Sequence, residues 1–270
     1  MKKLFFIVAA MFVAVSFSAC SDDDDNGGKA PAPEKLVKQI VFRGKWGDLD
    51  ESWTITITYD SENRVKKVDG LRNVSYEFTY NGNSLTVKGR DEYEYIDEDM
   101  TFVCYVCKLN SDGYITEIEE TGYETNGTDY YKLEYKNGYL QRVEKRYSYN
   151  ESRVGVSECT WRDGNLVESK CTDYNEDGTD ITTVKYSYSQ TATPINIDLF
   201  YIDGGYIDVP EPFALLGFYG RQSAKLPNKA NITYSGESES ESDDFGVYTL
   251  NDDGTVARID CGSVSYELIY

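Results

Sequence analysis

The sequence contains no histidine, and this absence removes several kinds of catalytic and metal-binding chemistry. Without an imidazole the chain has no Ser-His-Asp or Cys-His catalysis and no histidine-ligated metal. Basic residues are also in the minority, because 27 lysines and arginines stand against 47 aspartates and glutamates, for a formal net charge of −20. A chain this acidic does not bind nucleic acid by neutralising phosphates, so we expect no nucleic-acid partner.

Proline is scarce and unevenly placed. None of the six prolines lies between Glu34 and Thr193, whereas four occur from Pro194 to Pro227. Central β-strands exclude proline because it has no N–H to donate to a neighbouring strand. We therefore predict a sheet before residue 194 and a short helical or irregular insertion over 194–228, with its helix near Phe213-Ala214-Leu215-Leu216 covering the sheet.

Long apolar runs are missing except at residues 4–15, and this run is too short to span a bilayer. Lys2 and Lys3 precede it, and Ser18 and Ala19 lead from it into Cys20. This order is typical of a bacterial lipoprotein signal peptide, which predicts removal of residues 1–19 and attachment of acyl chains such as palmitate to Cys20. The alternative is an ordinary secretory signal with a coincidental cysteine.

A run of four aspartates, Asp22 to Asp25, follows Cys20 almost directly. It resembles the surface-export signal of Bacteroidetes outer-membrane lipoproteins. We interpret residues 20–35 as an acidic, flexible tether. The expected location is the outer membrane, held by the N-terminal lipid and facing the cell exterior, with the periplasmic leaflet as the alternative.

The body of the chain is rich in paired turn residues flanked by alternating apolar and polar positions. Asn-Gly and Asp-Gly pairs tolerate the positive φ angles that tight hairpin turns need. They occur at 69–70, 81–82, 112–113, 126–127, 137–138, 163–164, 177–178 and 253–254. Residues 36–270 are therefore predicted to be one all-β domain, an antiparallel up-and-down β-meander of about a dozen or more strands. A sheet of that size must curl strongly or close into a barrel.

The turns fall into two sets, which predicts two rims of the meander. One set is short and regular, with an aromatic or apolar residue, a polar turn and then an aliphatic residue, as in Tyr135…Leu140 and Trp161…Leu166. The other set is longer and more variable. From residue 110 onward, three turns of the regular set repeat at about 26-residue intervals, the length of one strand up and one strand down.

Several segments together resemble a family of Bacteroidetes outer-membrane lipoproteins classed as a domain of unknown function with a porin-like β-fold. They are the tyrosine-rich hairpin repeats, Pro194-Ile195-Asn196-Ile197-Asp198-Leu199, Leu215-Leu216-Gly217-Phe218-Tyr219-Gly220 and Leu226-Pro227-Asn228-Lys229. The resemblance covers about residues 36–270 and implies a porin-like β-fold. It implies no catalytic residues. A barrel that itself spans the membrane is disfavoured, because Lys145 lies on one face of its strand while Arg142, Glu144 and Arg146 lie on the other.

Five cysteines remain besides Cys20, an odd number that cannot pair completely. Cys104 and Cys107 form a C-x-x-C on a predicted strand, where they point to opposite faces, so we interpret them as small hydrophobic residues. Cys159 and Cys171 fall on neighbouring strands, but a two-residue turn at Asp163-Gly164 pairs residue 171 with 156, so a disulfide there requires another register. Which of them form disulfides stays open.

Acidic turns at 175–180 and 251–254 lack the carboxylate spacing of an EF-hand, so we interpret them as hairpin turns and predict no metal and no cofactor. The 24 tyrosines follow strand alternation, which favours packing, although tyrosine also suits sugar or protein recognition.

We predict a non-enzymatic surface lipoprotein that binds an extracellular glycan or protein, with no catalytic residues and with ligand-binding residues still to be identified. One alternative is a structural or accessory subunit of an outer-membrane assembly. The other is a hydrolase that uses only carboxylates.

Overall fold

Alternation of apolar and polar residues turns almost the whole domain into β-strands. The computed structural model describes residues 35–46, 49–91, 101–122, 127–150, 153–176, 178–192, 195–198, 207–236 and 240–270. The first nine strands are β1 (Gln39–Trp46), β2 (Leu49–Tyr59), β3 (Val65–Leu71), β4 (Val74–Asn81), β5 (Ser84–Asp91), β6 (Val103–Leu109), β7 (Ile115–Gly122), β8 (Thr128–Lys136) and β9 (Tyr139–Arg146). They are followed by β10 (Val154–Arg162), β11 (Asn165–Asn175), β12 (Gly178–Tyr188), helix α1 (Glu211–Leu215), β13 (Pro227–Tyr234), β14 (Ser240–Asp244), β15 (Val247–Leu250), β16 (Val256–Cys261) and β17 (Val264–Ile269).

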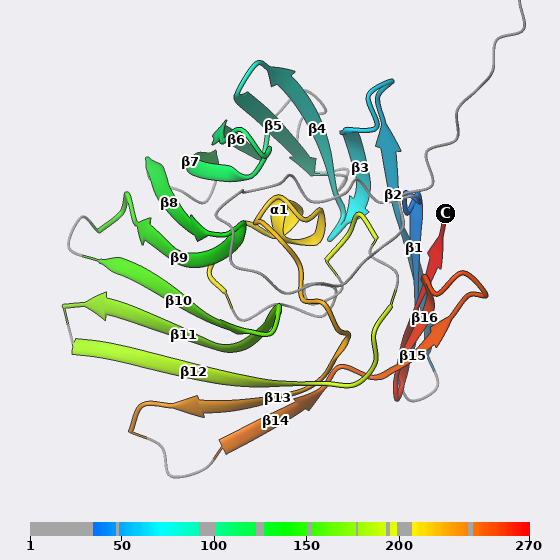
Figure 1. The fold of residues 1–270 in the computed structure, drawn as a ribbon. Helices are drawn as coiled ribbons and strands as arrows, with labels where there is room; N and C mark the ends of the chain where they lie inside the picture. The colour runs from blue at the N-terminus through cyan, green and yellow to red at the C-terminus, as the bar shows by residue number, and fades with distance from the viewer. Residues whose placement is uncertain are drawn as a thin grey trace, which may run out of the picture.

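All 17 strands belong to one antiparallel sheet, in which neighbours in sequence are neighbours in space. Strand β1 also pairs with β17, with Gln39 opposite Ile269, so the sheet curls until its first and last strands meet. Strands β14 and β15, which are linked by Phe245 and Gly246, are the exception among the described residues: β14 pairs with β13 and β15 pairs with β16, but no pairing joins β14 to β15, and the sheet is not closed there. The predicted up-and-down meander is thus confirmed as a strongly curled sheet (Figure 1).

The inner face of the curl is apolar, as strand β8 illustrates. Tyr131 and Leu133 are buried, whereas Tyr130, Lys132 and Glu134 between and beside them are exposed. The same period of two runs through the other long strands, because successive side chains of a strand point to opposite faces. We call the space that the curl surrounds the lumen.

Charged residues cover the outer face. Lys108 and Glu117 lie directly opposite each other on β6 and β7 and form an ion pair with an Nζ–Oε2 distance of 2.5 Å. Lys185 and Glu168 form a similar cross-strand pair at 3.9 Å on β12 and β11. Such exposed pairs contribute little to stability, about 0–1 kcal/mol each, but they mark this face as one that water covers.

The short, regular turns gather at one rim, where aromatic side chains fasten each hairpin to the one before it. The Tyr135 hydroxyl donates a hydrogen bond of 2.6 Å to the backbone oxygen of Ile115. Trp161 Nε1 donates one of 2.6 Å to the backbone oxygen of Leu140. Tyr188 and Tyr270 donate in the same way to Leu166 and Val256. Each acceptor follows a regular turn, so the sequence repeat corresponds to a repeated tie around this rim.

The end of the predicted insertion packs against the same rim. We call this rim the closed end. Backbone N–H groups of Arg221 and Ala224 donate to the carbonyls of Gly138 and Gly164 in two of the regular turns. Gly220 makes an isolated β-bridge with Tyr139. The insertion therefore supplies its backbone polar groups with partners from the hairpin turns. We call the opposite rim, which carries the variable turns, the open end.

The predicted short helix exists as α1, and it lies inside the curl, where it covers the inner face of the sheet (Figure 1). Phe213 is fully buried and contacts Phe78 and Tyr105 edge-to-face, with ring centroids 6.4 and 5.1 Å apart. Pro212, at the start of the helix, suits a position that needs no N–H donor. In the part of the chain that the structure describes, no helix is both long and apolar enough to cross a membrane.

The charged run at 237–244 predicts an exposed loop, because so many like charges cannot be buried together. In the structure, however, Ser240–Asp244 of this run forms β14 and pairs with β13. All five of its side chains are exposed. An edge strand has one free side, so a strand made only of polar residues can form there without burying any charge.

Candidate functional site

A cavity of about 800 Å³ lies between α1 and the inner face of β1, β2, β16 and β17. The turn between β3 and β4 and the last residue of β14 complete its wall. Its mouth is at the open end, because lining residues such as Glu51, Asn73 and Ser263 lie at or near the variable turns. This volume falls within the range of small-molecule binding sites.

Aromatic rings form one wall of the cavity. Phe42 and Trp53 are opposite each other on β1 and β2 and stack with ring centroids 3.4 Å apart and planes 22° apart. Tyr266, opposite Phe42 on β17, meets it edge-on at 5.4 Å. Phe42 is 4% exposed, whereas Trp53 is 44% exposed. The indole thus rests on a buried ring and presents apolar surface at the cavity.

Charged side chains form the rim on the other side. Arg72, in the β3–β4 turn, donates from Nε to both carboxylate oxygens of Glu211, at 2.9 and 2.8 Å. Burial raises the pKa of Glu211, and the Arg72 guanidinium opposes that shift. Glu51 and Asp244 also line the cavity. The lining therefore holds three carboxylates and one guanidinium, and the guanidinium is already paired.

A bulge in β3 places Arg72 at this rim. Gly70 has a φ of +79°, and a Cβ there would lie 2.5 Å from the backbone oxygen of Thr54 on β2. The pairing with β4 shifts between Val68 and Leu71, and the turn follows at Arg72 and Asn73, both with positive φ. The prediction of a turn at Asp69-Gly70 was therefore wrong by about three residues: this pair forms the bulge.

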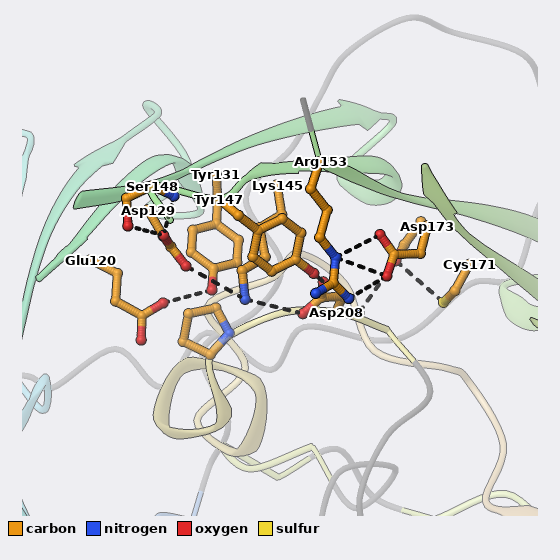
Figure 2. A network of polar contacts seen from close by, with 12 residues as sticks. Glu120, Asp129, Tyr131, Lys145, Tyr147, Ser148, Arg153, Cys171, Asp173 and Asp208 are labelled. Atoms are coloured by element: carbon orange, nitrogen blue, oxygen red, sulfur yellow. Dashed lines mark hydrogen bonds and ion pairs between the residues drawn. The ribbon is translucent and has the colours of Figure 1, made fainter. Parts of the chain in front are cut away.

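A second group of polar side chains lines the lumen on β7 to β11, away from the cavity wall. Figure 2 shows Lys145 between the rings of Tyr131 and Tyr147, and its Nζ lies 5.0 and 4.5 Å from the two ring centroids. The ammonium also lies 4.0 Å from Asp129 and 3.8 Å from Asp208. A lysine that is 16% exposed is tolerated here because two carboxylates and two aromatic faces surround it.

Asp208 connects this group to the chain segment that enters α1. Its Oδ2 accepts a hydrogen bond of 3.1 Å from Tyr147, and its backbone N–H donates to Ser157 Oγ at 3.3 Å. Arg153, which also lies over the Tyr147 ring, donates from Nε to both oxygens of Asp173 at 3.1 Å (Figure 2). The network thus fastens the insertion to the sheet, a structural task.

Glu120 is a half-buried carboxyl of the same region. Tyr131 donates a hydrogen bond of 2.6 Å to its Oε2. Burial raises the pKa of Glu120, although the tyrosine hydroxyl bond acts in the opposite direction. Burial, followed by the charge of Glu120, raises the pKa of Tyr131 far above its ordinary value. We therefore assign the Glu120–Tyr131 pair an effect on the pH dependence of stability rather than a role in catalysis.

The cysteines behave largely as predicted from the sequence. Cys104 and Cys107 point to opposite faces of β6, and Cys107 is fully buried. Cys171 lies opposite Ser157 rather than residue 156, because a bulge between Thr160 and Trp161 shifts the register by one residue. Cys159 is buried, and burial raises the pKa of its thiol to about 12.

The acidic turns also have structural explanations. In the turn at 251–254, Asp253 accepts hydrogen bonds from the Thr255 hydroxyl and backbone N–H and pairs with Lys35. Within the described ranges, no group of three or more acidic residues or cysteines is arranged to hold a metal ion. Cys20, the signal peptide and most of the tether lie outside the described residues, so lipidation stays a prediction.

The sequence did not identify the main residues of the cavity, which are Glu51, Trp53, Arg72, Glu211 and Asp244. The alternation of apolar and polar residues along 52–59 predicts that Trp53 shares one face of its strand with Ile55 and Ile57, but alternation does not reveal which residue of that face stays uncovered. The insertion was the signal in the sequence that could have indicated a cavity, since a short segment covers only part of the inner face of a curled sheet.

Similar folds occur among solved structures. The crystal structure of a porin-like protein from Bacteroides vulgatus ATCC 8482 superposes with a TM-score of 0.64, at 14% sequence identity, over 88% of this chain and 99% of that one. A porin-like protein from Bacteroides uniformis ATCC 8492 superposes with a TM-score of 0.62, at 12% identity, over the same shares of the two chains. These similarities confirm the porin-like β-fold that the sequence resemblance implied.

Sequence comparison adds no family, because no family model matches the chain and no curated protein matches it. At 12–14% identity the structural similarity concerns the fold alone. The features of this chain that bear on its function are therefore the cavity, the charged outer face and the N-terminal segment.

Proposed function

We propose that this protein is a non-enzymatic outer-membrane lipoprotein, acylated at Cys20 and exposed at the cell surface, which binds an extracellular glycan in its lumen cavity. One observation carries the proposal: a cavity of about 800 Å³ whose wall holds a tryptophan that is 44% exposed and stacked on a buried phenylalanine. Large aromatic residues that face the inside of a sheet are usually buried. An indole that faces the lumen and stays exposed is therefore explained best by contact with a ligand.

The direction of the chain favours an orientation in which the cavity mouth faces away from the membrane. Lys35 pairs with Asp253 in one of the short turns of the closed end, and β1 then runs from there toward the open end. A tether between Cys20 and Lys35 spans at most about 50 Å when fully extended. The lipid would thus hold the closed end toward the membrane, and the cavity mouth would face away from it.

The outer face of the sheet supports a domain that stands in water. A lysine or arginine on a lipid-facing strand costs about 2–4 kcal/mol at the bilayer midplane. Charged side chains lie along that face: the Lys108–Glu117 and Lys185–Glu168 pairs lie toward the closed end, and Lys132, which pairs with Glu134, lies midway along β8. Attachment by acyl chains on Cys20 needs no apolar outer face, whereas a spanning sheet does.

The charged rim favours binding over hydrolysis. A glycosidase of the two-carboxylate type needs one carboxyl group that stays protonated to donate to the leaving group. Glu211 is the partly buried carboxyl of the cavity, and burial raises its pKa, but Arg72 Nε contacts both of its oxygens and occupies the positions from which the carboxyl would donate a proton to a ligand. Glu211 is therefore better suited to holding Arg72 in place than to acid catalysis.

A glycan array with the lipidated protein extracted in detergent tests the binding. We expect a defined set of glycans to bind, and Trp53→Ala to lose at least about tenfold in affinity. Tyr130→Ala is the matched control, because Tyr130 is 51% exposed but lies on the outer face. Absence of binding to any glycan, or equal losses in both variants, would refute a glycan site in the lumen.

Anchoring and exposure need their own test in cells. We expect labelled palmitate to be incorporated in the wild type and in Cys104→Ala, but not in Cys20→Ala. Protease added to intact cells should digest the domain. Digestion only after lysis would place the protein in the periplasmic leaflet instead.

A further inference from the structure

The charges around the cavity are unbalanced. Among the described residues of its lining, three carboxylates come from Glu51, Glu211 and Asp244, on β2, α1 and β14, and one cation comes from Arg72. Arg72 is committed to Glu211, with its Nε 2.8 Å from Oε2. Two carboxylates in the lining are thus left without a guanidinium or ammonium group from within it. An anionic ligand would meet repulsion there, and a cationic ligand would meet attraction.

The aromatic wall has the same preference. The face of an aromatic ring is electron-rich, and tryptophan attracts a cation most strongly of the three aromatic residues. Trp53 has its indole stacked on Phe42 at 3.4 Å and is still 44% exposed, so one face is available to a ligand. Glu51 lies two residues before Trp53 on the same face of β2, opposite Gly44 of β1. An indole face and a carboxylate therefore lie side by side.

We propose that the ligand of this cavity is an amine-bearing sugar, whose ring stacks on Trp53 and whose ammonium group pairs with Glu51. This proposal rests on the proposed function, since it names the class of glycan that the lumen binds. The polar groups of Asn73 and Ser263 at the mouth supply further partners for sugar hydroxyls. Acidic glycans are disfavoured by the same carboxylates.

Three β-1,4-linked trisaccharides, built from glucosamine, glucose or glucuronic acid, distinguish a preference for a cationic sugar from a preference for a neutral or an acidic one. Calorimetric titration of the full lipidated protein at about pH 6, where a sugar amine is protonated, measures each affinity. We expect glucosamine to bind about tenfold more tightly than glucose, and glucuronic acid most weakly. Added salt should weaken the glucosamine complex more than the glucose complex.

Glu51→Gln tests the assigned pair. We expect about threefold weaker binding of the glucosamine trisaccharide and unchanged binding of the glucose trisaccharide. Glu158→Gln is the control, since Glu158 is exposed on β10, away from the cavity. Thermal unfolding of both variants checks that they are folded.

The outcomes distinguish this inference from the proposed function. Glucosamine that binds no better than glucose, or glucuronic acid that binds as tightly, overturns the preference for an amine. A preference for glucosamine that Glu51→Gln leaves unchanged overturns the assigned pair. In each case the glycan array with Trp53→Ala still decides on its own whether the lumen binds glycans.

Discussion

The two ends of the curled sheet are built from the same hairpins but differ in how their side chains are used. At the closed end, aromatic hydroxyl and indole groups donate to backbone carbonyls, and the insertion covers the turns. At the open end, Trp53 is half-exposed and Arg72 and Glu211 form an ion pair at a cavity. The difference indicates that the closed end serves stability, whereas the open end combines the Lys145 network, which fastens the insertion to the sheet, with a cavity suited to ligand recognition.

This division has a physical basis. A polar aromatic group at a buried rim stabilises the fold only when its hydrogen-bonding group finds a partner, and the carbonyls after the regular turns provide one. A binding site instead requires groups whose interactions are incomplete in the absence of ligand. The variable turns of the open end can differ in length without disturbing the ties at the closed end.

Phe213→Ala is expected to have the largest effect, because Phe213 joins α1 to the sheet core. It is fully buried and contacts Phe78, Tyr105 and Phe218. Its truncation should lower the free energy of unfolding by about 3–5 kcal/mol, measured by urea denaturation. Trp53→Ala, which removes a half-exposed ring, should cost about 1 kcal/mol. Equal losses would mean that the cavity wall at the open end is as tightly packed as the core around α1.

Gly220→Ala is expected to come next, at about 3 kcal/mol. Gly220 has a φ of +95°, and a Cβ there would lie 2.5 Å from the carbonyl oxygen of Gly138. Gly262→Ala is the control at the open end. Its φ is +72° but nothing lies within 4 Å of the added Cβ, so about 1 kcal/mol is expected. Denaturation of the two variants compares close packing at the two ends directly.

Tyr135→Phe isolates one tie of the closed end. The variant removes the hydroxyl that donates to the Ile115 carbonyl at 2.6 Å and leaves the ring in place. We expect a loss of about 1 kcal/mol in the free energy of unfolding. Tyr130→Phe, on the outer face, should change it by less than about 0.5 kcal/mol. A loss no greater in Tyr135→Phe would show that the ties do not stabilise this rim.

The smallest effect concerns pH and the half-buried carboxyl Glu120. Burial raises its pKa in the folded state, so the folded protein holds this proton at a pH where the unfolded chain, with a pKa of about 4.3, has lost it. Stability should therefore fall as pH rises from about 4 through the folded pKa. Glu120→Gln lacks this contribution to the slope.

Denaturation at several pH values tests this point. The difference in unfolding free energy between the wild type and Glu120→Gln should shift with rising pH in favour of the variant. Glu119→Gln, on the exposed face of the same strand, should keep the wild-type slope. Parallel profiles for all three proteins would mean that Glu120 is not desolvated in solution.

The pattern of residues along the chain was sufficient for the strands, their pairing of sequence neighbours and the place of the insertion. These properties are local: alternation sets the two faces of a strand, glycine and asparagine allow tight turns, and proline is excluded from central strands. Tyr131 and Leu133, for example, are buried as their alternation predicts. The bulge at Gly70 was missed, because it depends on a close approach to the Thr54 backbone of β2, and the register shift at Thr160/Trp161 was missed as well.

Only the tertiary structure decided where the cavity lies and which side chains line it. Trp53, Arg72, Glu211 and Asp244 are far apart in the sequence, and each looks ordinary in its own segment. The curl brings β14, β2 and the β3–β4 turn around one side of α1, and the size of α1 determines how much of the lumen stays unfilled. Such a space depends on the sum of many side-chain volumes, which no local pattern records.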